Sequence, residues 1–496
     1  MITEKYQTLA RQGIALTEPT IFERSSSERQ SFALAPLDVP EYLPSQYRRA
    51  QPAELPEVSE LQVVRHFTRL SSWNYAIDLG TFPLGSCTMK YNPRINEEIA
   101  ALAGLAEIHP DLPIPLSQGA LEVIFRLENA LCSIAGMDAC STQPAAGAHG
   151  ELTGLLLIRA FHENLGGRRR IVLIPDTAHG TNPASCILAG FEAVTLKSSS
   201  DGYLHAETVK QAINLHQRDI AALMMTNPNT LGIFESDIAE IAELIHGIGA
   251  QLYMDGANMN AIMGVTQPGK MGVDVMQYNL HKTFSTPHGG GGPGSGPVAV
   301  KSHLAPYLPG PRVVKTDTGF GLDYPAQSIG QIKSYFGNFG VLVRALCYIY
   351  RHGETGLKEV SRTAVLNANY LKSRLSEYFE VASKTPSLHE AVLTDQRQIK
   401  SHGVKTLQIA KSLIDEGFHP PTIYFPLVVP GAMLIEPTET ESLEELKELV
   451  NALGHIADLI AKGDTQFEQK PHKPVVGKVD EVGATRHPIL SLDDRP

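Results

Sequence analysis

The chain has 496 residues, 43% of them hydrophobic and 19% charged, with a formal net charge of −11 at pH 7. This composition supplies enough apolar surface for a conventional core and excludes a globally disordered chain or a small disulfide-stapled scaffold. The acidic balance excludes a general basic surface for nucleic acid or an acidic membrane, which favours a small-molecule enzyme.

The sequence has no apolar run of the roughly 20 residues needed to cross a bilayer. Its first residues, MITEKYQTLARQG, lack the pattern of a secretory signal. The 5 cysteines are an odd number without a CxxC pair, which argues against a disulfide framework and a zinc knuckle. We therefore expect a cytoplasmic protein that binds neither membrane nor nucleic acid.

The first part of the chain is expected to be an arm followed by short helices. Residues 1–60 contain prolines too frequent for a long helix, which predicts an extended N-terminal arm. Residues 61–115 are expected to form a segment of helices and loops. In it, a helix is predicted over 61–70, the run FPLGSCTMKYNP over 82–93 is typical of an ordered loop, and another short helix should end at Gly104.

Residues 116–340 are predicted to form a large α/β domain. A helix over 116–135 should end at Gly136, and β-rich runs then alternate with helical stretches. This alternation predicts a mainly parallel sheet covered on both faces. The predicted strands are 171–175, 193–196, 220–226, 251–254 and 273–278, and the predicted helices between them are 151–165, 183–189, 206–215 and 237–248.

Residues 341–496 are expected to form a smaller C-terminal α+β domain. The sequence first shows a helical pattern, then a β-rich stretch over 421–437, and then an amphipathic helical run over 442–459. The fold class is therefore α/β with a second, smaller domain.

Four predicted strands are each followed by a polar motif. These motifs are AHGTNP with His179, TNP with Thr226, DGAN with Asp255, and NLHKT with Lys282. The carboxyl ends of parallel strands share one edge of a sheet, where ligands bind. A lysine and an aspartate at that edge are what pyridoxal phosphate requires, because the lysine forms the Schiff base and the carboxylate keeps the ring nitrogen protonated.

A fifth motif supplies a site for an anion. GAHGE, with Ala148 and His149, opens a helix after the short run 139–143, and backbone N–H groups at a helix start favour a phosphate or carboxylate. The glycine-dense run HGGGGPGSG after Lys282 suits a backbone that passes close to a cofactor. Taken alone, Asp255 could be an ordinary turn residue and Lys282 an ordinary surface lysine. The prediction of a site rests on the occurrence of all these motifs together, in this order along the chain.

Three other patterns are interpreted as chance. The GxxxxGK match at 264–270 is followed by Met271 where a P-loop needs serine or threonine. The GxGxxG match within 289–294 lacks the strand and helix of a dinucleotide site. No histidine falls in HExxH, so no catalytic zinc site is predicted.

Together the motifs identify a resemblance. LGSCTMKYNP, QPAAGAHGE, AHGTNPAS, MTNPNTLGIFE, YMDGANMNA and NLHKTFSTPHGGGGPG resemble the P-protein family of the glycine cleavage system, from about Val63 to the C-terminus. The chain is similar in extent to glycine dehydrogenase (decarboxylating) subunit 2 of the split, two-gene form. The resemblance implies a type I pyridoxal-phosphate-dependent transferase fold and an α2β2 heterotetramer with glycine dehydrogenase subunit 1.

The resemblance also implies an activity and residue roles. The activity is decarboxylation of glycine with transfer of the aminomethyl group to the lipoyl arm of the H-protein, and no metal is implied. Lys282 would carry pyridoxal 5'-phosphate as a covalent Schiff base, with Asp255 on the pyridinium nitrogen and His179 stacked on the ring. Ala148, His149 and His281 would lie near the phosphate, while Thr226, Ala257 and Asn258 would line the ring.

Several questions stay open at this level. An arginine that binds the substrate carboxylate is expected among Arg312, Arg344 and Arg351, and the loop around Cys87 is either an active-site contributor or a packed turn. The alternatives are another type I pyridoxal-phosphate amino-acid decarboxylase that acts on a larger substrate, a non-catalytic companion subunit, or a module that only binds the H-protein. A yellow purified protein would favour the enzyme, and a colourless one a non-catalytic protein.

Overall fold

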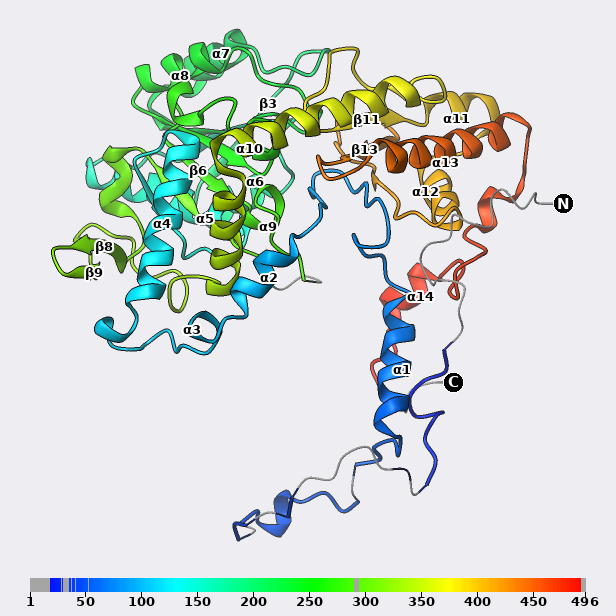
Figure 1. The fold of residues 1–496 in the computed structure, drawn as a ribbon. Helices are drawn as coiled ribbons and strands as arrows, with labels where there is room; N and C mark the ends of the chain where they lie inside the picture. Colours follow the sequence, from blue (N-terminus) through cyan, green and yellow to red (C-terminus); the bar gives the residue numbers. More distant parts are fainter. Residues whose placement is uncertain are drawn as a thin grey trace. The chain divides into compact units, whose positions relative to one another are not determined.

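The computed structural model describes residues 18–27, 29, 35–36, 38–40, 42–51, 53–289 and 294–491 (Figure 1). The chain separates into two compact units. Unit 1 comprises Met1–Gly80, Lys411–His419 and Thr465–Pro496, and unit 2 comprises Thr81–Ala410 and Pro420–Asp464. All residues to which the sequence assigns chemistry lie in unit 2. Much of the expected arm over 1–60, and the glycines at 290–292, lie outside the described residues.

Unit 1 contains the predicted helix α1 (Glu60–Ser71), which begins with a capping box. The Ser59 side chain accepts a hydrogen bond from the backbone of Gln62, whose side chain accepts one from the backbone of Ser59. Glu18, from the arm, accepts from His66 at 2.9 Å and lies 3.3 Å from Arg69, so the arm is fastened to α1. Unit 1 also contains α14 (Glu481–Arg486). In the described part of the chain, no helix is both long and apolar enough to cross a membrane.

Unit 2 is built on a seven-stranded sheet with the order β1-β7-β6-β5-β4-β2-β3. The strands from β3 to β6 pair in parallel, while β7 is antiparallel to both of its neighbours. All five predicted strands are confirmed, two with the predicted bounds and three with one end shifted by one or two residues. The strands are β1 (Ala139–Ser141), β2 (Ile171–Pro175), β3 (Glu192–Leu196), β4 (Ile220–Thr226), β5 (Gln251–Gly256), β6 (Val275–Tyr278) and β7 (Val298–Val300).

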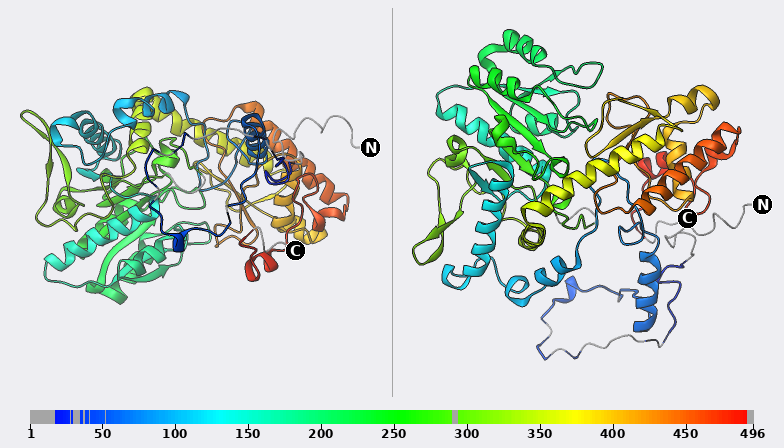
Figure 2. Two further views of the ribbon diagram at one scale, coloured as in Figure 1. Left: turned by 90° about the horizontal axis from the view of Figure 1, so that it is seen from below. Right: turned by 45° about the horizontal axis from the view of Figure 1, so that its top comes forward.

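Helices cover both faces of this sheet, as predicted (Figure 1; Figure 2). Strand β4 explains the two-sided burial, because Leu223 and Met225 contribute to one apolar core and Ala222 and Met224 to the other. Helices α4, α7 and α8 pack on the first core, and α5 and α6 on the second. Their bounds are α4 (Gln118–Ala135), α5 (Gly147–Asn164), α6 (Asn182–Leu188), α7 (Ala206–His216) and α8 (Ile238–Gly247).

Two helix ends illustrate the local signals. Helix α4 stops at Gly136, which adopts the left-handed conformation expected of a C-terminal glycine (φ 69°, ψ 32°). The helix expected to end at Gly104 is instead two helices, α2 (Arg94–Ala100) and α3 (Ala103–Ala106). Leu102 causes the break, because its extended backbone (ψ 132°) ends one helix and begins the next.

The remaining elements of the chain follow β6. They include a short helix α9 (Leu280–Thr283), a hairpin of β8 (Arg312–Thr316) and β9 (Gly319–Asp323), and the long helix α10 (Phe339–Leu375), which is kinked at Gly353. A second, four-stranded antiparallel sheet has the order β10-β11-β13-β12. Its strands and the last helices are β10 (Glu380–Val381), β11 (Ala391–Thr394), α11 (Gln396–His402), α12 (Thr406–Asp415), β12 (Thr422–Ile423), β13 (Ala432–Ile435) and α13 (Leu443–Ala461).

Candidate active site

The four predicted polar motifs meet at the carboxyl edge of the parallel strands. Thr226, the last residue of β4, pairs with Asp255 of β5, and Asp255 pairs with Gln277 of β6. The backbone N–H of His179, in the loop after β2, donates to the Thr226 hydroxyl at 3.3 Å. Lys282 lies in α9, immediately after β6. Strand register therefore brings together side chains that are up to about a hundred residues apart in sequence.

Asp255 is a buried carboxylate oriented by three donors. It is 1% exposed. It accepts hydrogen bonds from the Asn182 side chain at 3.0 Å, from the backbone of Ala257 at 2.9 Å, and from the Gln277 side chain. Gln277 is itself fixed by the Tyr253 hydroxyl at 2.6 Å. The aspartate is thus held in one orientation, as a fixed partner for a positively charged group.

His179 presents a neutral ring beside this carboxylate. Burial lowers the pKa of His179, although the Asp255 charge opposes that shift. Its Nδ1 lies 2.8 Å from the Thr181 hydroxyl, which donates at 2.7 Å to Glu151. The ring also contacts Phe425, with 5.9 Å between ring centroids. A flat, uncharged imidazole held in this way is suited to stack on an aromatic ligand.

Lys282 is the central amine of the site. The residue is 8% exposed. With the Asn279 amide turned so that its nitrogen donates to the Tyr278 carbonyl, the amide oxygen of Asn279 accepts from Lys282 Nζ at 3.3 Å. The positive charge of Lys282 acts on His179, His281 and His288. These interactions place the lysine among the aromatic rings of the predicted cofactor site.

The start of helix α5 forms a cradle for an anion. Among the described residues, no side chain caps this helix at Ala146, which leaves its first N–H groups, including those of Ala148 and His149, available to another acceptor. A Cβ on Gly147 would lie 2.5 Å from the Asn279 side chain, and a Cβ on Gly296 only 2.0 Å from the Ala146 carbonyl. The glycines therefore allow the backbone to approach closely around the helix start.

His281 and His288 complete this side of the site as neutral rings. Their ring centroids are 5.3 Å apart. Burial, with smaller contributions from the charges of His288 and Lys282, lowers the pKa of His281 to about 3. Burial and Lys282 likewise lower the pKa of His288 to about 4. In the described ranges, the buried Nε2 of His288 and hydroxyl of Thr286 have no hydrogen-bond partner. An amine, a carboxylate, a flat ring and unpaired donors at a helix start together fit pyridoxal phosphate.

The two depressed histidine pKa values predict how stability depends on pH. Between pH 6.5 and about 4 or 3, the unfolded chain binds protons at these positions and the native protein does not. The free energy of unfolding of cofactor-free protein should therefore fall as the pH falls through this window, by up to about 1.4 kcal/mol per pH unit for each histidine. Thermal unfolding measured from pH 7 to pH 4 checks this expectation.

The controls are single variants. His288→Gln should flatten the loss of stability at low pH, whereas His402→Gln, at the exposed end of α11, should leave the slope unchanged. An identical slope in wild type and His288→Gln would contradict the assignment.

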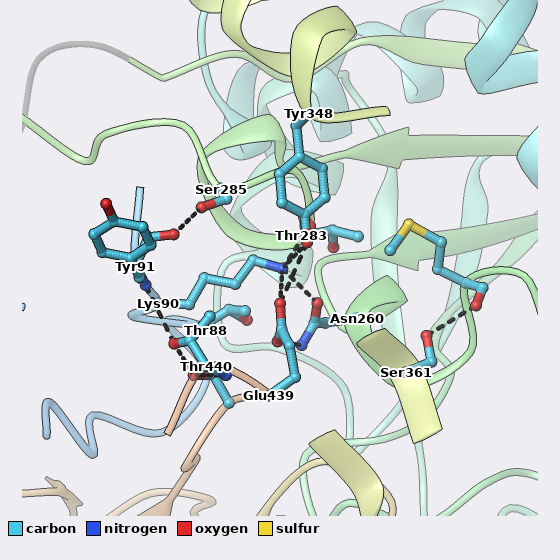
Figure 3. Close-up of polar contacts among 12 residues, drawn as sticks. Thr88, Lys90, Tyr91, Asn260, Thr283, Ser285, Tyr348, Ser361, Glu439 and Thr440 are labelled. Carbon is cyan, nitrogen blue, oxygen red and sulfur yellow. Dashed lines mark hydrogen bonds and ion pairs between the residues drawn. The ribbon is translucent and has the colours of Figure 1, made fainter. Parts of the chain in front are cut away.

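Lys90 connects several chain segments at the edge of the site through hydrogen bonds. This lysine is 3% exposed. Figure 3 shows its Nζ among acceptors from separate segments: the Thr283 carbonyl at 2.7 Å, Asn260 at 2.8 Å and Glu439 at 2.8 Å. The Tyr348 hydroxyl of α10 lies at 3.2 Å. Since Thr283 follows Lys282 directly, Lys90 fixes the backbone that carries the central amine.

Lys90→Met is expected to unfold more easily and to hold the cofactor more weakly. The substitution keeps the length of the side chain but leaves the partly buried Glu439 without its cation, which costs up to about 3 kcal/mol. Urea unfolding and retention of pyridoxal phosphate during dialysis measure the two effects. The double variant Lys90→Met/Glu439→Gln should lose less free energy of unfolding than Lys90→Met. It should still retain pyridoxal phosphate weakly, because the Thr283 carbonyl remains without its donor. Retention equal to that of wild type would contradict the positioning role.

The loop around Cys87 lies beside this network. Ser86 and Thr88 both have positive φ (62° and 48°), a conformation that non-glycine residues rarely adopt. Burial raises the pKa of Cys87, and the charge of Lys282 opposes this shift. The loop is therefore part of the surroundings of the central amine.

The expected substrate-binding arginine is not among the clear features of the site. Arg344 is held by two hydrogen bonds to Glu97, at 2.8 and 2.7 Å, and Arg312 acts on the buried carboxyl of Glu128. Arg351 is exposed on α10. Arg344 is thus already paired with a structural carboxylate, whereas the buried Nε of Arg312 has no hydrogen-bond partner among the described residues.

Sequence reasoning missed several residues that build the site. Gln277 stands out only as the polar residue of the buried strand β6, and Asn182 and Lys90 lie inside quoted motifs without having been singled out. Glu436 and Glu439 follow the apolar strand β13. A polar residue inside or directly after a fully apolar strand is the signal that would have identified Gln277 and Glu436.

Comparison with known proteins agrees with this geometry. The family model described as "Glycine cleavage system P-protein" matches residues 34–320, and the one described as "Glycine dehydrogenase, C-terminal domain" matches residues 360–476. A "Probable glycine dehydrogenase (decarboxylating) subunit 2" of Caldanaerobacter subterraneus subsp. tengcongensis is 51% identical over 477 residues, covering 95% of this chain and 98% of the relative. Its counterpart in Thermotoga maritima is 50% identical over 474 residues, covering 95% and 99%.

Solved structures show the same fold. A glycine decarboxylase (P-protein) of the glycine cleavage system in inhibitor-bound form matches with a TM-score of 0.70 and 23% identity, covering 84% of this chain and 93% of that one. An apo cysteine desulfurase from Thermococcus onnurineus NA1 matches with a TM-score of 0.60 and 14% identity, covering 77% and 95%. The fold is the type I fold of pyridoxal-phosphate-dependent enzymes, as the sequence predicts.

Proposed function

Because the chain belongs to the glycine cleavage system P-protein family, we propose that it carries out the pyridoxal-phosphate-dependent decarboxylation of glycine as subunit 2 of that enzyme. The aminomethyl group that remains after CO2 leaves passes to the lipoyl arm of the H-protein. The protein is thus an oxidoreductase that takes an amino donor and uses a lipoyl disulfide as acceptor. The supporting observation is that the buried amine of Lys282 and the buried carboxylate of Asp255 converge at one sheet edge.

The side chains of the site divide the work of holding the cofactor. Lys282 would hold it covalently through its amine, and Asp255 would keep a proton at the ring nitrogen. His179 would stack on the ring, and Thr226, Ala257 and Asn258 would line it. The N–H groups of Ala148 and His149 at the start of α5, together with His281, would bind the phosphate. When bound, the cofactor supplies a conjugated ring that accepts the electron pair released as CO2 leaves.

Three features of the chain act on the substrate. The buried setting of Lys282 limits water near the reacting amine. Lys90 and its partners keep the turn that carries Lys282 in place while the amine changes partners. The fixed carboxylate of Asp255 would stabilise a positively charged ring nitrogen of the bound cofactor.

The proposed assembly contains a companion and a carrier. The relatives are named subunit 2, which supports pairing with glycine dehydrogenase subunit 1 in an α2β2 heterotetramer. The lipoylated H-protein delivers the disulfide that accepts the aminomethyl group.

The visible absorption spectrum tests this function. The purified chain, supplied with pyridoxal phosphate, should show the band of a lysine-bound cofactor, and adding glycine should change it, with or without the companion subunit. A band that responds to a larger amino acid and ignores glycine would favour another decarboxylase. No band at all would favour a non-catalytic companion.

A further inference from the structure

A second group of titratable side chains lies at the end of the C-terminal sheet. Strands β11 and β13 pair with Ala391 opposite Ile435, so the same register places Glu390 beside Glu436 just beyond the ladder. His389 and Glu390 are 0% exposed and Glu436 is 1% exposed. One ligand-type atom from each of the three lies within 4.8 Å of the others. We call His389, Glu390 and Glu436 the acidic trio.

The burial of the acidic trio favours a proton inside it. Two adjacent buried carboxylates repel each other, and a proton on or between them relieves that repulsion. Burial raises the pKa of Glu436, and Glu390 raises it further, whereas His389 and the hydrogen bonds from Thr88 oppose this. Burial lowers the pKa of His389, but Glu390 and the charge of Glu436 together outweigh burial and leave that pKa raised. Both shifts favour protons stored inside the trio at neutral pH.

The acidic trio lies within electrostatic range of the central amine. The charge of Lys282 acts on His389, and the charge of Glu390 acts on His179 and Cys87. Glu436 accepts hydrogen bonds from the backbone and hydroxyl of Thr88, at 2.9 and 2.6 Å, in the loop beside Lys282. The trio is therefore connected to the site and is not an isolated structural ion pair.

The acidic trio also has unused hydrogen-bonding capacity. Across the part of the chain that the structure describes, neither ring nitrogen of His389 and neither carboxyl oxygen of Glu390 makes a hydrogen bond of normal geometry. This holds although Nε2 of His389 lies 2.7 Å from Oε1 of Glu390. Fully buried polar atoms without partners are costly and mark a place where a further group binds or a proton moves.

We propose that the acidic trio stores the proton that links the two halves of the reaction. The inference rests on the proposed function. Glycine brings an ammonium group with three hydrogens, and the transferred aminomethyl group keeps two of them. The trio takes up the third when the amine enters the site and returns it to the sulfur released from the lipoyl disulfide.

The atoms and electrons of this sequence balance. The carbon–carbon bond of glycine breaks, CO2 leaves, and the electron pair of that bond forms the new carbon–sulfur bond. The sulfur–sulfur bond breaks, and its electron pair stays on the departing sulfur, which takes the stored proton to become a thiol. Glycine is oxidised and the disulfide is reduced, so no other oxidant, reductant or acid is needed.

The first experiment detects the stored proton directly. The infrared spectrum of the holoenzyme with its companion subunit should contain a carboxylic-acid C=O band that changes when glycine is added. The change should disappear in Glu390→Gln and Glu436→Gln. Glu441→Gln is the matched control, because burial raises the pKa of Glu441 to about 7 while its side chain accepts a hydrogen bond from Thr81. A glycine-dependent change that survives in both trio variants would overturn the proposal.

The second experiment counts protons. Calorimetric binding of glycine in buffers of different ionisation enthalpy should show little net release from wild type and from Glu441→Gln. The variants Glu390→Gln and Glu436→Gln should release about one proton per glycine, because one of the two storing carboxyls is gone. Equal release by wild type and both variants would contradict storage in the trio.

A kinetic measurement separates the trio from the proposed function. With lipoylated H-protein, each trio variant should lose on the order of a hundredfold in kcat and gain a larger solvent deuterium effect, with little change in the glycine KM. Thermal unfolding identifies a variant that fails to fold, and the other one then carries the test. Wild type that neither binds nor decarboxylates glycine would refute the proposed function. Active wild type with unimpaired trio variants would refute only the role of the trio.

Discussion

Lys282→Ala should fold normally and lose activity by about 10⁴-fold or more, the scale on which removal of a covalent group acts. The alanine cannot bind the cofactor covalently, so the lysine-dependent visible band should disappear. The fold should persist because the lysine contributes little to the apolar cores on either side of the sheet. Absorption spectra, circular dichroism and glycine decarboxylation measured on the same sample check these outcomes together.

A second lysine provides the control for this result. Lys301 also follows a strand of the main sheet, and its Nζ contacts the Gly136 carbonyl at 3.2 Å and Asp138 at 3.1 Å. Lys301→Ala should keep both the visible band and the activity. The assignment of Lys282 as the central amine would be wrong if Lys282→Ala still decarboxylated glycine. It would also be wrong if Lys301→Ala lost the visible band as well.

Asp255→Asn should bind the cofactor weakly and slow the reaction by about a hundredfold or more. The buried carboxylate faces donors from Asn182, Ala257 and Gln277, and an asparagine amide turns its own donor toward at least one of them. Losing one partner of a buried charged contact costs about 3 kcal/mol or more, which corresponds to the stated loss of rate. The dissociation rate of the cofactor and kcat both measure the effect.

Asp274→Asn is the control for Asp255→Asn. It shows the effect of losing a buried aspartate that does not contact the ring nitrogen of the cofactor. Asp274 lies just before β6, at the amino edge of the same sheet, and accepts from His246 at 2.7 Å and from the backbone of Leu252 at 2.8 Å. This variant should lose stability to a similar degree but retain the cofactor. Cofactor affinity reduced equally in both variants would show that Asp255 acts only through stability.

The main sheet and the convergence of its polar motifs were predictable because both depend on local patterns. Strand β4 is a fully buried apolar run, and its neighbours have the same character, so their order along the chain indicates a parallel sheet. Once the sheet is parallel, the residues after each strand must share an edge. Asp255 and Lys282 were therefore placed near each other without any knowledge of contacts.

The contacts between the main sheet and the C-terminal segment were not predictable in the same way. Strand β7 has three residues after a run of glycine and proline, which gives too weak a pattern for a strand. Glu390 and Glu436 become neighbours only through the register of two short antiparallel strands, which a single sequence does not specify. Lys90 resembles any loop lysine until its four partners from distant segments are known.

The contact between Lys90 and Glu439 also constrains the order of events during synthesis. The two residues are 349 positions apart, and the Thr283 carbonyl that shares the same ammonium group is 193 positions from Lys90. The turn that carries the reactive lysine therefore receives its last support only after nearly the whole chain has left the ribosome. Such long sequence separations slow folding. Under the proposed function, capture of the cofactor in a rigid site should therefore be a late event in the maturation of this protein and should require that the segment carrying Glu439 has folded.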